Sequence, residues 1–398
     1  MCSNNEDDTV AAMIKAEVEP INFQETCKKC NESKVAVKLK FKEAQCEKCF
    51  LAYVRHKFRA SLGSTKIVGR GSTILIIYDG KPKSSVLLDM LRFAFFQDTY
   101  KKLHFEPYVL YIDDSAVFNL TDEQRCDQLQ RVKVLLEQYG FKAYGTSITD
   151  STNCLQSFED YMKQAIPNDE VIEFKTKFHS TGSHTSADDY IGNIRTNIIR
   201  KVASKLNANF AFTSEIESDL AKIFLTNVTL GRGGSVCQDI AFCDTRGAVP
   251  IIRPIRNLDV AEVDHYIKFN KIECLDVHAM DIDGMFEKSL QNVTKSFIDE
   301  LQTNYPSTIS TIFRTGDKIS GIWDDKGEVV VDGKCTFCGS GIGAKKSETI
   351  QALEYSRFVS ENTCDVRLNF VSDDRGDLSK CYGCRNIFKD LLISNESE

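Results

Sequence analysis

The sequence lacks several features that would place it in a class at once. No apolar run reaches the roughly 18 residues that a helix needs to cross a membrane, so we predict no membrane span. The first eight residues contain neither the basic nor the apolar stretch of a secretory signal, which favours a cytoplasmic protein. The histidines show no metal-type spacing, and we interpret His179, His184, His265 and His278 as structural.

Cysteine, by contrast, is abundant. Fifteen cysteines in 398 residues are hard to explain as disulfides in a reducing compartment, where clustered cysteines more often bind metal or do chemistry. Eight of them form four C-x-x-C pairs. Isolated cysteines are most often small buried hydrophobic residues, and we interpret six of them in this way: Cys2, Cys126, Cys154, Cys237, Cys243 and Cys274.

The first two cysteine pairs have the spacing of a four-thiolate zinc site. Cys27 and Cys30 are followed, after fifteen residues, by Cys46 and Cys49. Two residues between ligands allow both sulfurs of a pair to reach one tetrahedral ion at about 2.3 Å. The alternative is four unrelated thiols, but the spacing favours zinc.

The last two pairs form a similar but more widely spaced set. Cys335 and Cys338 are separated by 42 residues from Cys381 and Cys384, with Cys364 between them. Glycines in or directly after these pairs suit knuckle turns, which predicts a second zinc site. Redox pairing, free thiols, and an ion shared between one N-terminal and one C-terminal pair stay open as alternatives.

Charge is distributed unevenly along the chain. The net charge is −7, yet residues 21–70 hold twelve Lys or Arg against four Glu. A basic module on an acidic body indicates a polyanionic partner. Within it, residues 50–59 read as a helix with apolar residues on one face and with Arg55, Lys57 and Arg59 elsewhere.

From residue 71 the pattern alternates between short apolar strands and helices, which predicts an α/β fold with a parallel sheet covered on both faces. Strands are expected at 72–77, 107–112, 141–148 and 209–213, and helices at 83–100, 121–139, 154–164, 187–206, 215–230, 258–271 and 282–301. We predict four regions: a disordered acidic tail (1–20), a zinc-binding basic module (21–70), the α/β domain (71–330) and a C-terminal cysteine-pair module (331–398).

The stretch Tyr78-Asp-Gly-Lys-Pro-Lys-Ser-Ser85 joins a buried strand to an amphipathic helix. A strand, a tight turn and a helix N-terminus in succession form a common phosphate site. In a parallel sheet such a turn lies at the carboxyl edge, where ligands bind. The turn is therefore the candidate nucleotide site.

This order of cysteine pairs, basic helix and β-turn-α unit resembles the tRNA-thiolating branch of the PP-loop ATP-pyrophosphatase family. Members have Ser-Gly-Gly-x-Asp-Ser at the turn, where this chain has Asp79-Gly-Lys-Pro-Lys-Ser84. Gly80 and Ser84 match the pattern, whereas Asp79, Lys81 and Lys83 do not. The resemblance covers residues 25 to 390 and implies a PP-loop domain flanked by zinc knuckles at both ends.

The departures from the family pattern weaken the phosphate site. Asp79 places a carboxylate where an anion would bind, and Pro82 offers no N–H to it. Lys81 hinders close backbone approach, so we expect ATP not to bind productively. The body also lacks cysteines between Cys154 and Cys237, and residues 212–220 lack the His of the family's Gly-His-Asn-x-x-Asp segment.

An eroded turn with intact cysteine pairs resembles the non-catalytic, Ncs2-type subunit of cytoplasmic tRNA 2-thiolation. The resemblance implies a heterodimer with a catalytic PP-loop partner. That complex moves sulfur from thiocarboxylated Urm1 to the wobble uridine (U34) of tRNAs for Lys, Glu and Gln. This chain would contribute tRNA binding and scaffolding and would not be catalytic alone. Its first zinc module and Arg55, Lys57 and Arg59 would contact the phosphates of the tRNA. The alternative for the basic helix is a solvated face. Two alternatives stay open: an active ATP-dependent sulfurtransferase, and a zinc-stapled adaptor without RNA contact.

Overall fold

The computed structural model describes ten stretches of the chain, which hold the whole sheet and both sets of cysteine pairs. The described residues are 26–39, 42–97, 102–118, 120–149, 155–166, 168–179, 183–275, 288–325, 331–343 and 379–393. The predicted acidic tail, Cys364 and His278 lie outside them. The four domain limits stay a prediction.

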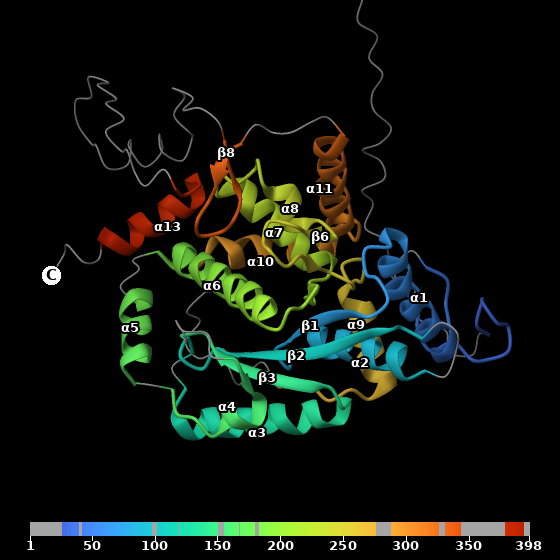
Figure 1. The fold of residues 1–398 in the computed structure, drawn as a ribbon. Coiled ribbons are helices and arrows are strands. Elements are labelled where there is room, and N and C mark those ends of the chain that lie inside the picture. Colours follow the sequence, from blue (N-terminus) through green and yellow to red (C-terminus); the bar gives the residue numbers. More distant parts are fainter. Residues whose placement is uncertain are drawn as a thin grey trace, which may run out of the picture.

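A seven-stranded, mostly parallel sheet forms the centre of the molecule (Figure 1). Its order is β4-β3-β2-β1-β5-β7-β6, with only the short edge strands β4 and β6 antiparallel. The strands are β1 Ser72–Tyr78, β2 Phe105–Asp113, β3 Lys142–Ser147, β4 Gln156–Ser157, β5 Phe210–Phe212, β6 Cys243–Asp244 and β7 Ile251–Ile252. The predicted α/β class with a parallel sheet is confirmed.

Helices cover both faces of this sheet and bury two separate cores, as the strands' apolar composition requires. One core is closed by α1 Glu47–Thr65, α2 Pro82–Phe96, α3 Asp122–Tyr139, α4 Phe158–Met162 and α9 Val260–Asn270. The opposite core is closed by α5 Asn168–His179 and α6 His184–Lys205 (Figure 1). Ile74 and Ile76 of β1 face the first core and Leu75 the second, so alternate residues of one strand serve both.

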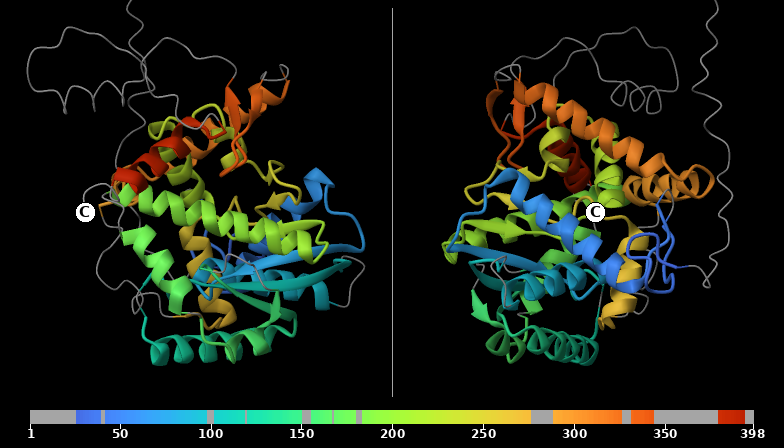
Figure 2. Two further views of the ribbon diagram at one scale, coloured as in Figure 1. Left: turned by 60° about the vertical axis from the view of Figure 1, so that its left-hand side comes forward. Right: turned by 90° about the vertical axis from the view of Figure 1, so that its right-hand side faces the viewer.

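A third group of helices lies beyond α6, on the side away from the sheet (Figure 2). It contains α7 Glu217–Thr229, α8 Val236–Ile240, α10 Leu290–Asn304, α11 Thr308–Asp325 and α13 Tyr382–Ile393, with the hairpin of β8 Val331–Lys334 and β9 Gly341–Gly343. Phe224 of α7 and Phe313 of α11 share a small core of their own.

Local sequence signals explain where several helices begin. Thr121 caps α3 in a reciprocal capping box with Gln124, at the start of the helix predicted at 121–139. The predicted helix at 154–164 is wrong at its start, because Gln156 and Ser157 add an edge strand and only residues 158–162 are helical. The α11 helix was not predicted, although its apolar residues pack against α7.

The strand order reverses direction between β1 and β5. The chain moves outward through β1, β2 and β3, and later returns to build β5 and β7 on the other side of β1. At such a point the connections diverge and leave a crevice at the carboxyl edge. The stretch 78–85 leaves β1 at this crevice, so the fold places the candidate nucleotide turn where ligands bind.

Candidate metal centres and nucleotide turn

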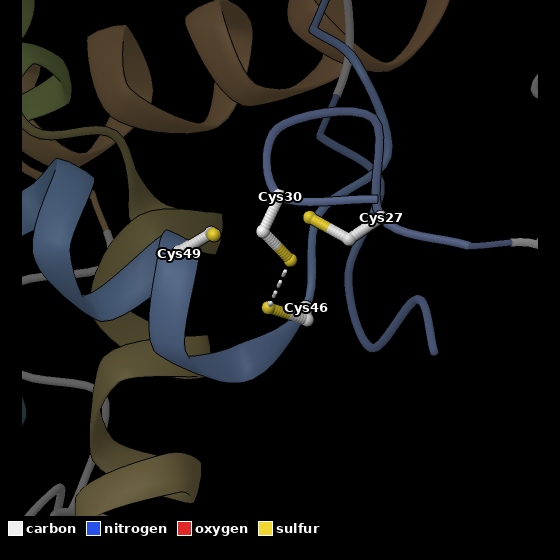
Figure 3. A group of neighbouring side chains, drawn as sticks. All are labelled: Cys27, Cys30, Cys46 and Cys49. Carbon is white, nitrogen blue, oxygen red and sulfur yellow. Dashed lines mark hydrogen bonds between the residues drawn. The ribbon is translucent and has the colours of Figure 1, made fainter. Parts of the chain in front are cut away.

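The four N-terminal cysteines converge on one point (Figure 3). Their sulfurs all lie within 4.8 Å of one another, and those of Cys30 and Cys46 are 3.9 Å apart. Two come from a tight loop, while Cys46 is the N-cap of α1 and Cys49 lies in its first turn. Asn31 closes the loop in a left-handed conformation, with its N–H donated to the carbonyl of Cys27 at 2.8 Å.

The thiols of this quartet differ in how readily they lose a proton. Burial opposes ionisation of Cys27, but N–H groups of Cys46, Cys30 and Lys29 outweigh it and lower its pKa to about 6. Burial and the neighbouring thiols raise the pKa of Cys49 to about 12. Four soft sulfurs at tetrahedral spacing fit a thiolate-binding ion, which would replace the remaining protons. This quartet can therefore hold a metal ion.

The four C-terminal cysteines form a second, more deeply buried quartet. Their sulfurs also lie within 4.8 Å of one another, and those of Cys338 and Cys381 are 3.6 Å apart. Hydrogen bonds from the other three thiols lower the pKa of Cys335. Gly339 turns the first pair in a left-handed conformation, with its N–H donated to the Cys335 carbonyl at 2.9 Å. Each quartet is built from its own two pairs, so an ion shared across the two ends is not what this structure favours.

Most isolated cysteines that the structure describes are partly buried. Cys237, Cys243 and Cys274 are half-buried. Cys126 is exposed on α3, so the interpretation as a small buried residue is wrong there. Its side chain points to solvent because the core face of α3 is formed by Leu129, Val132 and Leu136.

The candidate nucleotide turn is filled by its own side chains. The Asp79 carboxylate accepts the Lys81 N–H at 3.0 Å and the Ser84 hydroxyl. The Ser84 hydroxyl also accepts the Asp79 N–H at 3.3 Å. These donors lie at the start of α2, and donors at a helix N-terminus are the groups that commonly bind phosphate. The Asp79 carboxylate therefore occupies two donors at the N-terminus of α2.

Leu275, which follows α9 in the chain, packs against the same turn. Leu275 donates its N–H to the Gly80 carbonyl at 2.8 Å, and a Cβ on Gly80 would lie 2.2 Å from the Leu275 side chain. Gly80 also has φ +76°, which favours glycine. Lys83 reaches across the crevice to Asp219 of α7 at 2.6 Å. The sequence did not predict the contact of Leu275 with Gly80 or that of Asp219 with Lys83, because the two residues of each pair are far apart in the chain.

The three basic residues predicted to contact RNA are largely occupied within the chain. Lys57 pairs with the fully buried Glu262 of α9 at 2.7 Å. Arg55 donates to Asn270 at 3.0 Å and lies 3.7 Å above the ring of Phe93, at the rim of a surface hollow of about 730 Å³. Arg59 is half-buried, and burial lowers the pKa of its guanidinium.

Glu262 itself was not singled out from the sequence. Lys42 and Lys57 both bind its carboxylate, at 2.6 and 2.7 Å, so one buried acid fastens the basic module to α9. Burial would raise the pKa of this carboxyl, but Lys57 and Lys42 hold it below its ordinary value. A capping-box pattern with Asp259 was its only local signal.

Known proteins resemble this chain in sequence and in fold. A family model described as "Cytoplasmic tRNA 2-thiolation protein 2" matches residues 289–386. The relative of that name from Anopheles gambiae is 39% identical, covering 98% of this chain and all of its own length. The one from Drosophila melanogaster is 36% identical, covering 99% of this chain and all of its own length.

A solved structure adds the fold. The "U34-tRNA thiolase NcsA from Methanococcus maripaludis with its [4Fe-4S] cluster" aligns with a TM-score of 0.56 over 82% of this chain and 95% of that chain, at 16% identity. Among the described residues no helix is long and apolar enough to cross a membrane. The identity to relatives over nearly the full length carries the assignment: the chain belongs to the cytoplasmic tRNA 2-thiolation protein 2 family.

Proposed function

We propose that this chain is the non-catalytic subunit of a cytoplasmic complex that 2-thiolates wobble uridine 34 in tRNAs for Lys, Glu and Gln. It pairs with a catalytic PP-loop subunit, which activates the uracil carbonyl with ATP, and sulfur comes from thiocarboxylated Urm1. This chain supplies a dimer surface and part of the tRNA cradle. The names of its relatives and the thiolase-like fold support the reaction class and the cytoplasmic location.

The filled turn is the observation that supports a non-catalytic role. A nucleotide phosphate would have to displace the Asp79 carboxylate from the Lys81 N–H and the Ser84 hydroxyl. Left in place, two like charges about 4 Å apart repel by about 4 kcal/mol at an effective dielectric near 20. Leu275 packs against Gly80 as well, so the backbone offers little room for close approach.

Nucleotide binding by the isolated chain tests this role. We expect no saturable ATP binding at micromolar concentration and no Mg²⁺-dependent release of AMP, measured by calorimetry and by chromatography of the products. Asp79→Ser removes the internal anion, and we expect weak ATP binding to appear without thiolation. ATP cleavage by the unaltered chain would instead establish the alternative of a sulfurtransferase active by itself.

Zinc is the ion we propose for both quartets, in a structural role. Four cysteine sulfurs within 4.8 Å of one another are the ligand set of a structural zinc site. Elemental analysis of the purified chain should give two zinc ions per molecule. Iron with the absorbance of an iron–sulfur cluster would overturn the proposal for the quartet that carries it.

The proposed tRNA contacts of Arg55, Lys57 and Arg59 compete with their contacts inside the chain. Four other lysines of the same module are exposed and lie in the segments that carry the N-terminal quartet: Lys28, Lys29, Lys34 and Lys48. Each phosphate that is neutralised adds to the salt dependence of binding. Measuring tRNA affinity against salt for alanine at 55, 57 and 59, and for glutamine at 28, 29 and 48, separates the two surfaces.

We expect the alanine variant to lower the salt slope by less than one unit per residue, because Lys57 is held by Glu262. An unchanged slope in both variants would favour the second candidate, a zinc-stapled adaptor that does not touch RNA. The internal pairing of Arg55 and Lys57 is the observation in its favour. Crosslinking of tRNA to the partner subunit alone would then establish it.

A further inference from the structure

Three arginines, one buried and two partly buried, lie near the C-terminal quartet. Arg200 of α6 donates to the Cys338 carbonyl at 3.4 Å, and Arg246 donates to Ser340 at 3.1 Å. Arg232, in the loop after α7, approaches a sulfur itself, with its Nη2 3.7 Å from the Sγ of Cys384. Lysines near the N-terminal quartet, by contrast, are exposed.

Arg232 is fixed from its other side by a carboxylate. Its two terminal nitrogens donate to the two oxygens of Asp189 at 2.7 and 2.6 Å, and the side chain is 7% exposed. A bidentate pair of this kind sets the plane of the guanidinium. A Cβ on Gly383 would lie 2.5 Å from the Arg232 Nε, so glycine inside the second pair makes room for this approach.

The charges explain why an arginine belongs here. Four thiolates around a divalent ion leave a net charge of −2, which is costly in a buried position unless donors face the sulfurs. Asp189 orients Arg232, and Arg232 faces Cys384, in the way that a carboxylate orients a metal-bound histidine. The guanidinium cannot lose its proton, so it donates at every relevant pH.

Asp189 also belongs to the part of α6 where several elements meet. One residue further, the ring of Tyr190 stacks on Phe337 with centroids 5.8 Å apart. Ser186 donates to Asp390 of α13, and Asp188 accepts the Ser289 hydroxyl at the start of α10. Phe337 and Asp390 lie in the two segments that carry the C-terminal quartet, so these segments bind the first half of α6 directly.

We propose that Arg232 is a positioning residue of the C-terminal metal centre. Arg232 holds the Cys384 thiolate and, through Asp189, couples metal occupancy to the first half of α6. This proposal rests on metal binding by the quartet and not on tRNA thiolation.

Zinc release from the full chain tests the first half of the proposal. The chain is loaded with Zn²⁺, and transfer of the ion to a colorimetric chelator is followed in time. Cys46→Ser removes a ligand of the N-terminal quartet, so the phase of zinc release that is lost in this variant belongs to that quartet. We expect Arg232→Met to speed the C-terminal phase by about 10- to 100-fold, as for other outer-shell partners, and to leave the N-terminal phase unchanged.

Matched variants separate coupling to the metal from general loss of packing. Arg256→Met removes an equally buried arginine that pairs with Asp317, and it should leave both phases unchanged. Arg232→Lys keeps the charge but not the bidentate pair and should give an intermediate rate. Asp189→Asn should speed the same phase less than Arg232→Met. Equal rates for Arg232→Met and Arg256→Met would overturn the proposal.

Hydrogen exchange tests the second half and does not depend on how the Arg232 variants fold. Cys384→Ser removes a ligand of the C-terminal quartet, and we expect faster exchange of amides 184–195 with no change in α3. Cys46→Ser is the control, which should leave residues 184–195 as protected as in the unaltered chain. Equal protection of α6 in all three proteins would disprove the coupling.

Discussion

The two cysteine quartets share a motif but are attached to the body in different ways. At the N-terminal quartet the sulfurs are flanked by exposed lysines, and the module is fastened some distance away, where Glu262 binds Lys42 and Lys57. At the C-terminal quartet the attachment is at the cysteines themselves, through the contact of Arg232 with Cys384. A set of four thiols can therefore lie in a module that is attached to the body at other residues, or can itself make the contact between elements.

Loss of a ligand from each quartet gives the largest expected difference. We expect Cys46→Ser and Cys384→Ser each to remove one zinc ion per chain, since a structural zinc site contributes on the order of 10 kcal/mol to local folding. Limited proteolysis should cut the first variant within residues 26–49 and the second around α13 and α6. Cys126→Ser, at an exposed isolated thiol, is the control. Cleavage at the same positions in both variants would contradict the comparison.

Removing the remote attachment should have a smaller effect. Glu262→Gln breaks the buried ion pairs with Lys42 and Lys57, and we expect a loss of about 3 kcal/mol in the free energy of unfolding. Both lysine side chains can turn toward water in this variant, so the expected loss in the free energy of unfolding is near the low end of the range for broken buried ion pairs. Urea denaturation measures it, with Glu137→Gln, whose partner lies on the surface of α3, as the control. Zinc content of the N-terminal quartet should not change.

The same variant has a predictable dependence on pH. The pKa of Glu262 is held below its ordinary value of 4.5, so its contribution is fully present above that pH. It is lost as the pH falls through the lower value of the folded state. The difference in stability between the unaltered chain and Glu262→Gln should therefore be constant from pH 6 to pH 8 and shrink below about pH 4. A difference that grew on acidification would have the wrong sign.

The exposed lysines should have the smallest effect on metal binding. We expect glutamine at 28, 29 and 48 together to change the rate of zinc release from the N-terminal quartet by less than about threefold, because solvent and salt screen exposed charges. The expected 10- to 100-fold effect of Arg232→Met at the other quartet is the reference. Comparable effects at the two quartets would mean that burial of the neighbouring cation does not distinguish them.

Local patterns predicted the framework of this molecule well. The C-x-x-C spacing grouped the right eight cysteines, and the alternation of apolar runs predicted the parallel sheet and the turn after β1. Those signals act over a few residues, through ligand spacing and side-chain periodicity. The same signals could not separate β4 from α4, where only a few residues divide an edge strand from a helix.

Contacts between distant segments escaped prediction for a physical reason. Leu275 on Gly80, Glu262 under Lys57 and Arg232 against Cys384 join positions whose neighbourhood is created only by the fold. Arg55 and Lys57 illustrate the same point, because a basic helix looks alike in sequence whether its cations face solvent or a buried acid. The tRNA contacts assigned to that helix stay a prediction.

The internal pairing of Asp79 has a consequence for how this protein responds to nucleotide. An enzyme that needs a bound triphosphate to complete its loop gains thermal stability with rising nucleotide concentration, by mass action. Here a carboxylate of the chain itself binds the neighbouring donors and cannot dissociate. We therefore expect the melting temperature of this protein to stay the same whether ATP is scarce or abundant.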